Sequence, residues 1–183
     1  MGLFKEVKKA PLDLSDWSLS DFGLVKEVDE WASLIFVRVY DSLDTTQYPI
    51  GYIFVCDPKF GDRAQWKMPA GHATSKDKTP LHTACRELSG ETGISLSLNR
   101  FLYCGKIRGP RGDHWRCVFT ADMDYSGDLP WMNDKHPENE GEMQKYFSVD
   151  DFYRLVRERR FLRNHFDILE SYALILPLGR DKK

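Results

Sequence analysis

The sequence contains no long apolar run. No stretch of its 183 residues approaches the roughly 18 consecutive apolar residues of a membrane-spanning helix. The lysines near the N-terminus are not followed by an apolar segment, so the pattern of a secretory signal peptide is missing as well. We therefore expect a cytoplasmic protein that is not inserted in a membrane.

Cysteine is scarce and unpaired in the sequence. The four cysteines (Cys56, Cys85, Cys104 and Cys117) include no C-x-x-C pair, and each lies in an apolar run. This placement is typical of small buried side chains, whereas four-ligand zinc sites show paired ligand spacing. The cysteine pattern thus argues against a structural zinc site.

The sequence also lacks a strong net charge. Its 26 Lys and Arg residues and 28 Asp and Glu residues give a formal charge of −2, so no overall field attracts nucleic acid or anionic lipid. This weighs against a dedicated nucleic-acid-binding protein. With 42% apolar and 30% charged residues, the composition is that of a soluble globular protein, and the length fits one domain.

The order of apolar patterns predicts a layered domain. We interpret residues 1–20 as an N-terminal arm that could pair with a partner subunit in a homodimer, and residues 21–183 as the domain. Strands are expected at 24–28, 32–40, 51–56, 64–69, 101–107, 115–121 and 143–147. Helical patterns follow Ser148, with Asp151 three residues later, and cover 161–173. Strands, a helix, strands and further helices predict an α/β or α+β domain.

The clearest predicted helix lies between Thr79 and Gly93. Thr79 suits the N-cap, Pro80 the first turn and Gly93 the C-terminal end. An apolar stripe at helical spacing is formed by Leu81, Ala84, Cys85 and Leu88. The pattern therefore predicts an amphipathic helix with one face on the core.

Two carboxylates of this helix are the strongest candidates for functional residues. Glu87 and Glu91 are four residues apart, so they lie on one helix face. Pointed into a cleft, they offer hard oxygen ligands for Mg²⁺ or Mn²⁺, which in turn bind a diphosphate. Arg86 would orient a carboxylate, and Gly71 before the helix would let the backbone approach closely.

The segment 68–94, MPAGHATSKDKTPLHTACRELSGETGI, resembles the Nudix box, whose pattern is G-x5-E-x7-R-E-U-x-E-E-x-G-U with U a bulky aliphatic residue. The matching positions are Arg86, Glu87, Leu88, Glu91, Gly93 and Ile94. The resemblance implies an α/β/α sandwich with a mixed central sheet. It also implies metal-dependent hydrolysis of a nucleoside diphosphate linked to another moiety, X.

The segment departs from the family pattern at three positions. Gly90 stands at the first Glu of the E-E pair, and Ala70 replaces one glycine of the usual Gly-Gly. Lys78 stands where the upstream Glu would be, and the interval from Gly71 is one residue too long. A lost ligand lowers metal affinity, so we expect activity that is slow or that demands Mn²⁺.

Other candidates lie outside the box. Nudix enzymes often place a catalytic base before the last strand, which here points to Glu140 and its neighbours Glu138 and Glu142. Two basic groups could receive phosphate: Arg63 with Lys59 and Lys67, and Arg111 with Arg108 and Arg116. Trp66 and Trp115 could stack on a base. For each, a solvated loop or a buried core position is the simpler alternative.

Three functional hypotheses follow. The first is a Nudix hydrolase with Glu87 and Glu91 as metal ligands and Arg86 as the orienting residue, the base being one of these acids or Glu140. The second is an inactive Nudix-fold module that binds a nucleotide or a protein, favoured by Gly90 and Lys78. The third is a structural domain without a ligand, which requires the 86–91 cluster to lie on the open surface.

Overall fold

The structure is a computed structural model and describes residues 8–9, 18–25, 29–41, 48–125 and 143–175. A seven-stranded mixed sheet forms the centre of this part, in the order β1-β5-β6-β2-β3-β7, with β4 paired to β2 beside this path. Its strands are β1 (Lys8–Lys9), β2 (Trp31–Tyr40), β3 (Gly51–Cys56), β4 (Ala70–His72), β5 (Phe101–Arg108), β6 (Trp115–Asp124) and β7 (Met143–Ser148). The pair β2 and β6 runs parallel, whereas the other neighbours run antiparallel.

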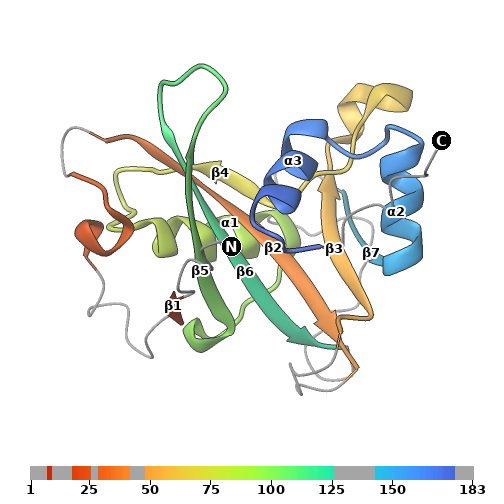
Figure 1. Ribbon diagram of the computed structural model, residues 1–183, viewed down its shortest axis with the longest axis horizontal. Helices are drawn as coiled ribbons and strands as arrows, with labels where there is room; N and C mark the ends of the chain where they lie inside the picture. The colour runs from red at the N-terminus through yellow and green to blue at the C-terminus, as the bar shows by residue number, and fades with distance from the viewer. Residues whose placement is uncertain (1–7, 10–17, 26–28, 42–47, 126–142, 176–183) are drawn as a thin grey trace, which may run out of the picture.

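Helices cover both faces of the sheet (Figure 1). They are α1 (Pro80–Thr92), α2 (Val149–Arg157) and α3 (Arg163–Ser171), with short 3-10 helices at Leu19–Phe22 (η2), Pro58–Arg63 (η3) and Leu98–Arg100 (η4). The side chains of β2 alternate between two cores: Ile35 and Val37 pack with α1, whereas Leu34 and Phe36 pack with α2 and α3. The expected α/β/α sandwich with a mixed sheet is therefore confirmed.

The predicted helix ends agree with the structure. Thr79 accepts a hydrogen bond from the His82 backbone N–H, and Gly93 ends α1 in the left-handed conformation with φ of 70°. Ser148 accepts a hydrogen bond from the Asp151 N–H and so caps α2. Capping chemistry is local, which explains why these boundaries were readable from sequence.

One predicted strand differs from the structure, and another lies mostly outside the described residues. In the 64–69 segment, Trp66 and Lys67 form only isolated bridges, and the strand lies instead at Ala70–His72, where it pairs with β2. The region 24–28 is described only to Val25, whose N–H donates to the Asp29 carboxylate instead of to a strand. Among the described helices, none is long and apolar enough to cross a membrane.

Candidate functional site

Helix α1 covers the edge of β4 that faces away from β2. The Ala70 N–H donates to Glu91 Oε2 at 2.9 Å, and Arg86 Nη2 donates to the His72 carbonyl at 2.8 Å. Within the described part of the chain β4 pairs only with β2. Side chains of α1 therefore complete the hydrogen bonding of a strand edge that would otherwise need water.

Glu87 lies directly against Gly71. A Cβ atom at Gly71 would collide with the Glu87 carboxylate, so only glycine leaves room for this side chain. Arg86 Nη1 donates to Glu87 Oε1 at 2.6 Å, and the Glu87 side chain is only 15% exposed. The close backbone approach at Gly71 thus positions a carboxylate of α1 over β4.

Arg86 joins α1 to the loop that precedes it. Its Nε and Nη2 atoms donate to the Asp77 carboxylate at 3.1 and 2.8 Å. Burial raises the pKa of Asp77, but the hydrogen bonds from Arg86 and from the Thr74 N–H outweigh burial and lower it. Sequence analysis missed Asp77, although this acid follows Gly71 at the G-x5-E spacing of the pattern, whereas counting back from Arg86 gives Lys78.

Glu91 is the more enclosed of the two candidate ligands. Its side chain is 11% exposed, and Oε1 lies 3.5 Å from the Lys67 ammonium. Both carboxylates thus have a cation beside them, Arg86 for Glu87 and Lys67 for Glu91. The third hypothesis, an acidic cluster on the open surface, does not match this burial.

The donor set fits a divalent ion that completes its coordination with other groups. No group of three or more His, Cys, Asp or Glu side chains in the described residues could hold a metal ion by itself. Mg²⁺ in phosphate-processing sites is usually bound by one or two carboxylates, with water and substrate phosphates supplying the rest. Glu87 and Glu91 meet that requirement, whereas the described residues form no all-protein cage.

A pocket of about 160 Å³ opens next to β4, and we call it the β4 pocket. Its lining residues are Ala32, Leu34, Lys67, Ala70, Gly71, His72, His114, Arg116 and His165. Ala32 on β2 is paired with both Arg116 on β6 and His72 on β4, so these three lie in one row across the sheet. The small side chain of Ala32 leaves the space between its two larger neighbours.

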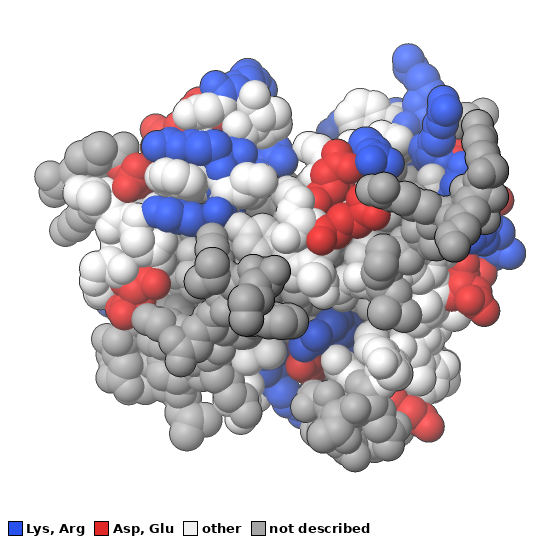
Figure 2. All heavy atoms as spheres, viewed as in Figure 1, with Lys and Arg blue, Asp and Glu red and all other residues white. Residues whose placement is uncertain are grey.

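The members of the two basic groups that the sequence suggested as phosphate sites do not stay together in the fold. Arg63 ends η3 and is exposed, Arg111 is exposed in the turn between β5 and β6, and neither lines the β4 pocket. Figure 2 shows Lys and Arg side chains gathered over this hairpin. By contrast, Lys67 from one group and Arg116 from the other line the same pocket. Their meeting depends on strand pairing and could not be read from spacing.

The remaining candidates have mixed outcomes. Glu138, Glu140 and Glu142 lie outside the described residues. Trp66 is buried and contacts Phe147 edge-on at 4.8 Å, as the core alternative predicts. The Trp115 ring is contacted by Lys106 and Arg108, 4.1 and 3.8 Å from its centroid, which leaves little of its face for a base.

Comparison with known proteins agrees with this architecture. The NUDIX domain model matches residues 28–169. None of the curated proteins matches the sequence at a significant level. Among solved structures, the NUDIX domain of Shewanella oneidensis NrtR, complexed with ADP ribose, superposes with a TM-score of 0.56 at 15% identity, over 88% of this chain and 94% of that one.

Two further structures are similar. A NUDIX hydrolase from Nitrosomonas europaea gives a TM-score of 0.51 at 16% identity, covering 80% of this chain and 89% of that one. A bifunctional NMN adenylyltransferase/ADP ribose pyrophosphatase from Francisella tularensis, complexed with AMP and a Mn ion, gives 0.56 at 18% identity, over 80% of this chain and 41% of that one. At these identities the likeness concerns the fold, while the domain match covers most of the sequence. The chain belongs to the Nudix family.

Proposed function

We propose that the protein hydrolyses a nucleoside diphosphate linked to another moiety, with Glu87 and Glu91 holding a Mg²⁺ or Mn²⁺ ion. The observation that carries the proposal is that both carboxylates lie against β4, Glu91 at the Ala70 N–H and Glu87 at Gly71, and are mostly buried. The ligands of two structural neighbours, ADP ribose in one and AMP with a Mn ion in the other, are consistent with a nucleotide substrate.

The bound ion would supply charge stabilisation for the phosphoryl oxygens and lower the pKa of an attacking water. In the reaction, the oxygen of water bonds to one phosphorus and the bridging P–O bond breaks. Two phosphate monoesters leave, and the proton of the water passes to a carboxylate, either a helix acid or Glu140. Arg86 holds Glu87 in place through the 2.6 Å ion pair, so its role is positioning.

Lys67 has a different role in this scheme. Its ammonium lies beside Glu91 and also lines the β4 pocket, so it links the carboxylates to the space where substrate would enter. A lysine at this place attracts phosphate as a point charge. Gly90 removes one acid of the family pattern, so we expect a weakly held ion and slow turnover.

The test is a hydrolysis assay over a panel of diphosphate compounds that begins with ADP ribose, with Mg²⁺ or Mn²⁺ and with a chelator. The proposal expects release of phosphate monoesters, faster with Mn²⁺ and abolished by the chelator. Calorimetric titration of Mn²⁺ gives a readout that does not depend on turnover. If the protein neither binds Mn²⁺ nor cleaves any member of the panel, the proposal is wrong.

A further inference from the structure

The β4 pocket is lined by nitrogen-bearing side chains from separate elements. Lys67 follows η3, Arg116 lies on β6 and His165 lies on α3. None of its nine described lining residues is acidic. Such a pocket suits a negatively charged group.

Arg116 differs from Lys67 in this pocket because no ion pair with a described residue holds its guanidinium. It is partly buried, and within the described residues it makes no hydrogen bond or ion pair. Burial lowers the pKa of its guanidinium, and only the charge of Asp113 acts to raise it. A cation removed from water without a partner costs free energy, which an anion bound beside it would offset.

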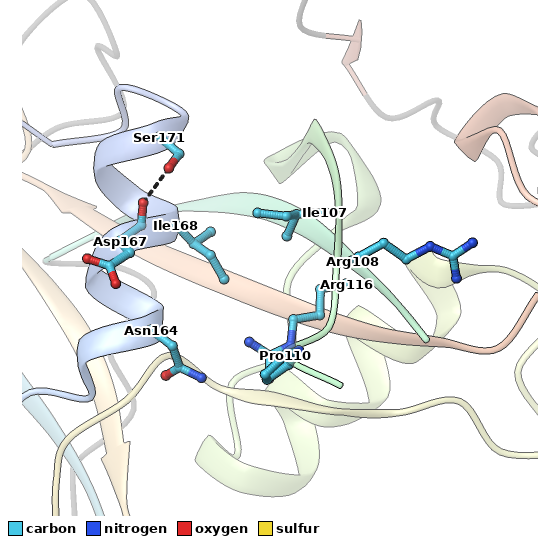
Figure 3. A pocket seen from close by; sticks show the side chains of 8 residues that line it. All are labelled: Ile107, Arg108, Pro110, Arg116, Asn164, Asp167, Ile168 and Ser171. Atoms are coloured by element: carbon cyan, nitrogen blue, oxygen red, sulfur yellow. Dashed lines mark hydrogen bonds between the residues drawn. The ribbon is translucent and has the colours of Figure 1, made fainter. Parts of the chain in front are cut away.

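Arg108, on the neighbouring strand β5, does not line the β4 pocket. Figure 3 shows a second cavity, of about 180 Å³, between the β5–β6 hairpin and α3. In that view Arg108 points away from α3, and its guanidinium lies 3.8 Å from the Trp115 ring centroid. Arg116 instead descends toward Pro110 and lines both cavities. Of these two arginines, Arg116 is therefore the one whose guanidinium can contact a ligand in the β4 pocket.

His165 contributes a hydrogen-bond donor. Its Nδ1 accepts a hydrogen bond from the Met68 backbone N–H at 3.2 Å, so Nδ1 carries no proton. A neutral imidazole then carries its hydrogen on Nε2, where it can donate. Because Lys67 is balanced by Glu91, the uncompensated charge at the pocket is that of Arg116.

The size of the pocket limits what can bind. Its volume of about 160 Å³ is below the roughly 300–1,000 Å³ of pockets that hold drug-sized ligands. A single tetrahedral oxyanion with a few waters fills such a space, whereas a nucleoside would extend beyond it. Donors that arrive from three elements match tetrahedral oxygens better than they match a planar carboxylate.

We propose that the β4 pocket binds a phosphate monoester group of the substrate, separate from the diphosphate at α1, through Arg116, Lys67 and His165. The assignment of this phosphate to the substrate rests on the proposed hydrolase function. The subsite selects diphosphate compounds whose second moiety carries a further phosphate. Binding of the phosphate group itself does not depend on turnover.

Isothermal titration with inorganic phosphate, and separately with acetate, tests the subsite in the full chain. Wild type is expected to bind phosphate more tightly than acetate, and Arg116→Met to weaken phosphate binding by about 10- to 100-fold. Arg157→Gln, an exposed arginine on α2, is the matched control and should bind phosphate as wild type does. Equal binding by wild type and Arg116→Met, or no phosphate binding by wild type, overturns the proposal.

Thermal unfolding separates the binding role from a structural one. Since Arg116 is partly buried and forms no ion pair with the described residues, Arg116→Met should keep or raise the melting temperature while phosphate binding is lost. If that variant does not fold, Ala32→Leu is the second test of phosphate binding, because the larger side chain of this lining residue fills the β4 pocket while Arg116 is kept. Unchanged phosphate binding in Ala32→Leu contradicts the proposal. Failure of hydrolysis alone leaves these binding results intact, so the two proposals fail separately.

Discussion

Glu91 Oε2 accepts a hydrogen bond from the Ala70 backbone N–H at 2.9 Å. The carboxylate completes the edge of β4, and in the proposed function its other oxygen, beside Lys67, would hold the metal ion. This double role determines which substitutions are informative. Glutamine keeps an oxygen that accepts from Ala70, whereas alanine removes the strand cap together with the charge.

Two glycine-to-alanine substitutions near α1 should have opposite effects. Gly71→Ala places a methyl group against the Glu87 carboxylate, and we expect a loss of about 1–3 kcal/mol in unfolding free energy together with reduced turnover. Gly90→Ala adds the same methyl group in open space inside a helix and should stabilise by about 1 kcal/mol. Urea denaturation of both variants measures this. A stable, active Gly71→Ala protein would mean that Glu87 need not lie over β4.

Restoring the missing acid should strengthen metal binding. Gly90 lies three residues after Glu87, on a neighbouring position of the helix surface, and a Cβ atom added there has no neighbour within 4 Å. Gly90→Glu is expected to raise Mn²⁺ affinity and turnover, because a third carboxylate joins the cluster. Gly90→Gln has the same shape and helix propensity without the charge. If the two variants bind Mn²⁺ equally in a calorimetric titration, position 90 does not reach the ion.

Stability should fall at mildly acidic pH because of His165. Burial, reinforced by the charges of Arg116 and Lys67, lowers the pKa of His165 from 6.5 to about 3. Below pH 6.5 the His165 side chain binds a proton in the unfolded chain but stays neutral in the folded chain. The stability that neutral His165 contributes is therefore fully present above pH 6.5. It is lost progressively as the pH falls toward 3.

The expected size of the His165 effect is about 2 kcal/mol between pH 7 and pH 5. Urea denaturation at both pH values, with wild type and His165→Gln, isolates it, because Gln can still accept from the Met68 N–H. The variant should lose less stability on acidification than wild type. Parallel losses in the two proteins would show that His165 is not buried in its neutral form.

The contrast between α1 and the β4 pocket shows what the sequence could predict. The helix was readable to its last residue because Thr79, Pro80 and Gly93 act on adjacent backbone, and the motif inside it identified the family. Arg116 and His165 could not be placed near Lys67, because they are brought together by the β2–β6 pairing and by α3 packing. Asp77 has the G-x5-E spacing from Gly71, but its ion pair with Arg86 depends on how the loop folds back onto the helix.

The short strand shows how tertiary pairing displaces a local pattern. A strand was predicted at 64–69, but Trp66 and Lys67 form only isolated bridges there, and Trp66 and Met68 both pack in the core beneath α2 and α3. The strand forms instead at residues 70–72, where Gly71 pairs with Ser33. Because Gly71 has no side chain, the Glu87 carboxylate can lie against it. The close backbone approach expected at Gly71 is thus present, whereas the pairing of residues 70–72 with β2 depends on tertiary contacts.

Turnover by Glu91→Gln tests the central claim most directly. The substitution keeps the oxygen that accepts from Ala70 and removes the charge that would hold the ion, so folding should persist while activity falls by roughly two orders of magnitude or more. Glu170→Gln on the exposed face of α3 is the matched control. The account predicts that Glu91→Gln melts near the wild-type temperature yet neither binds Mn²⁺ tightly nor hydrolyses the substrate. Wild-type hydrolysis by Glu91→Gln would contradict it.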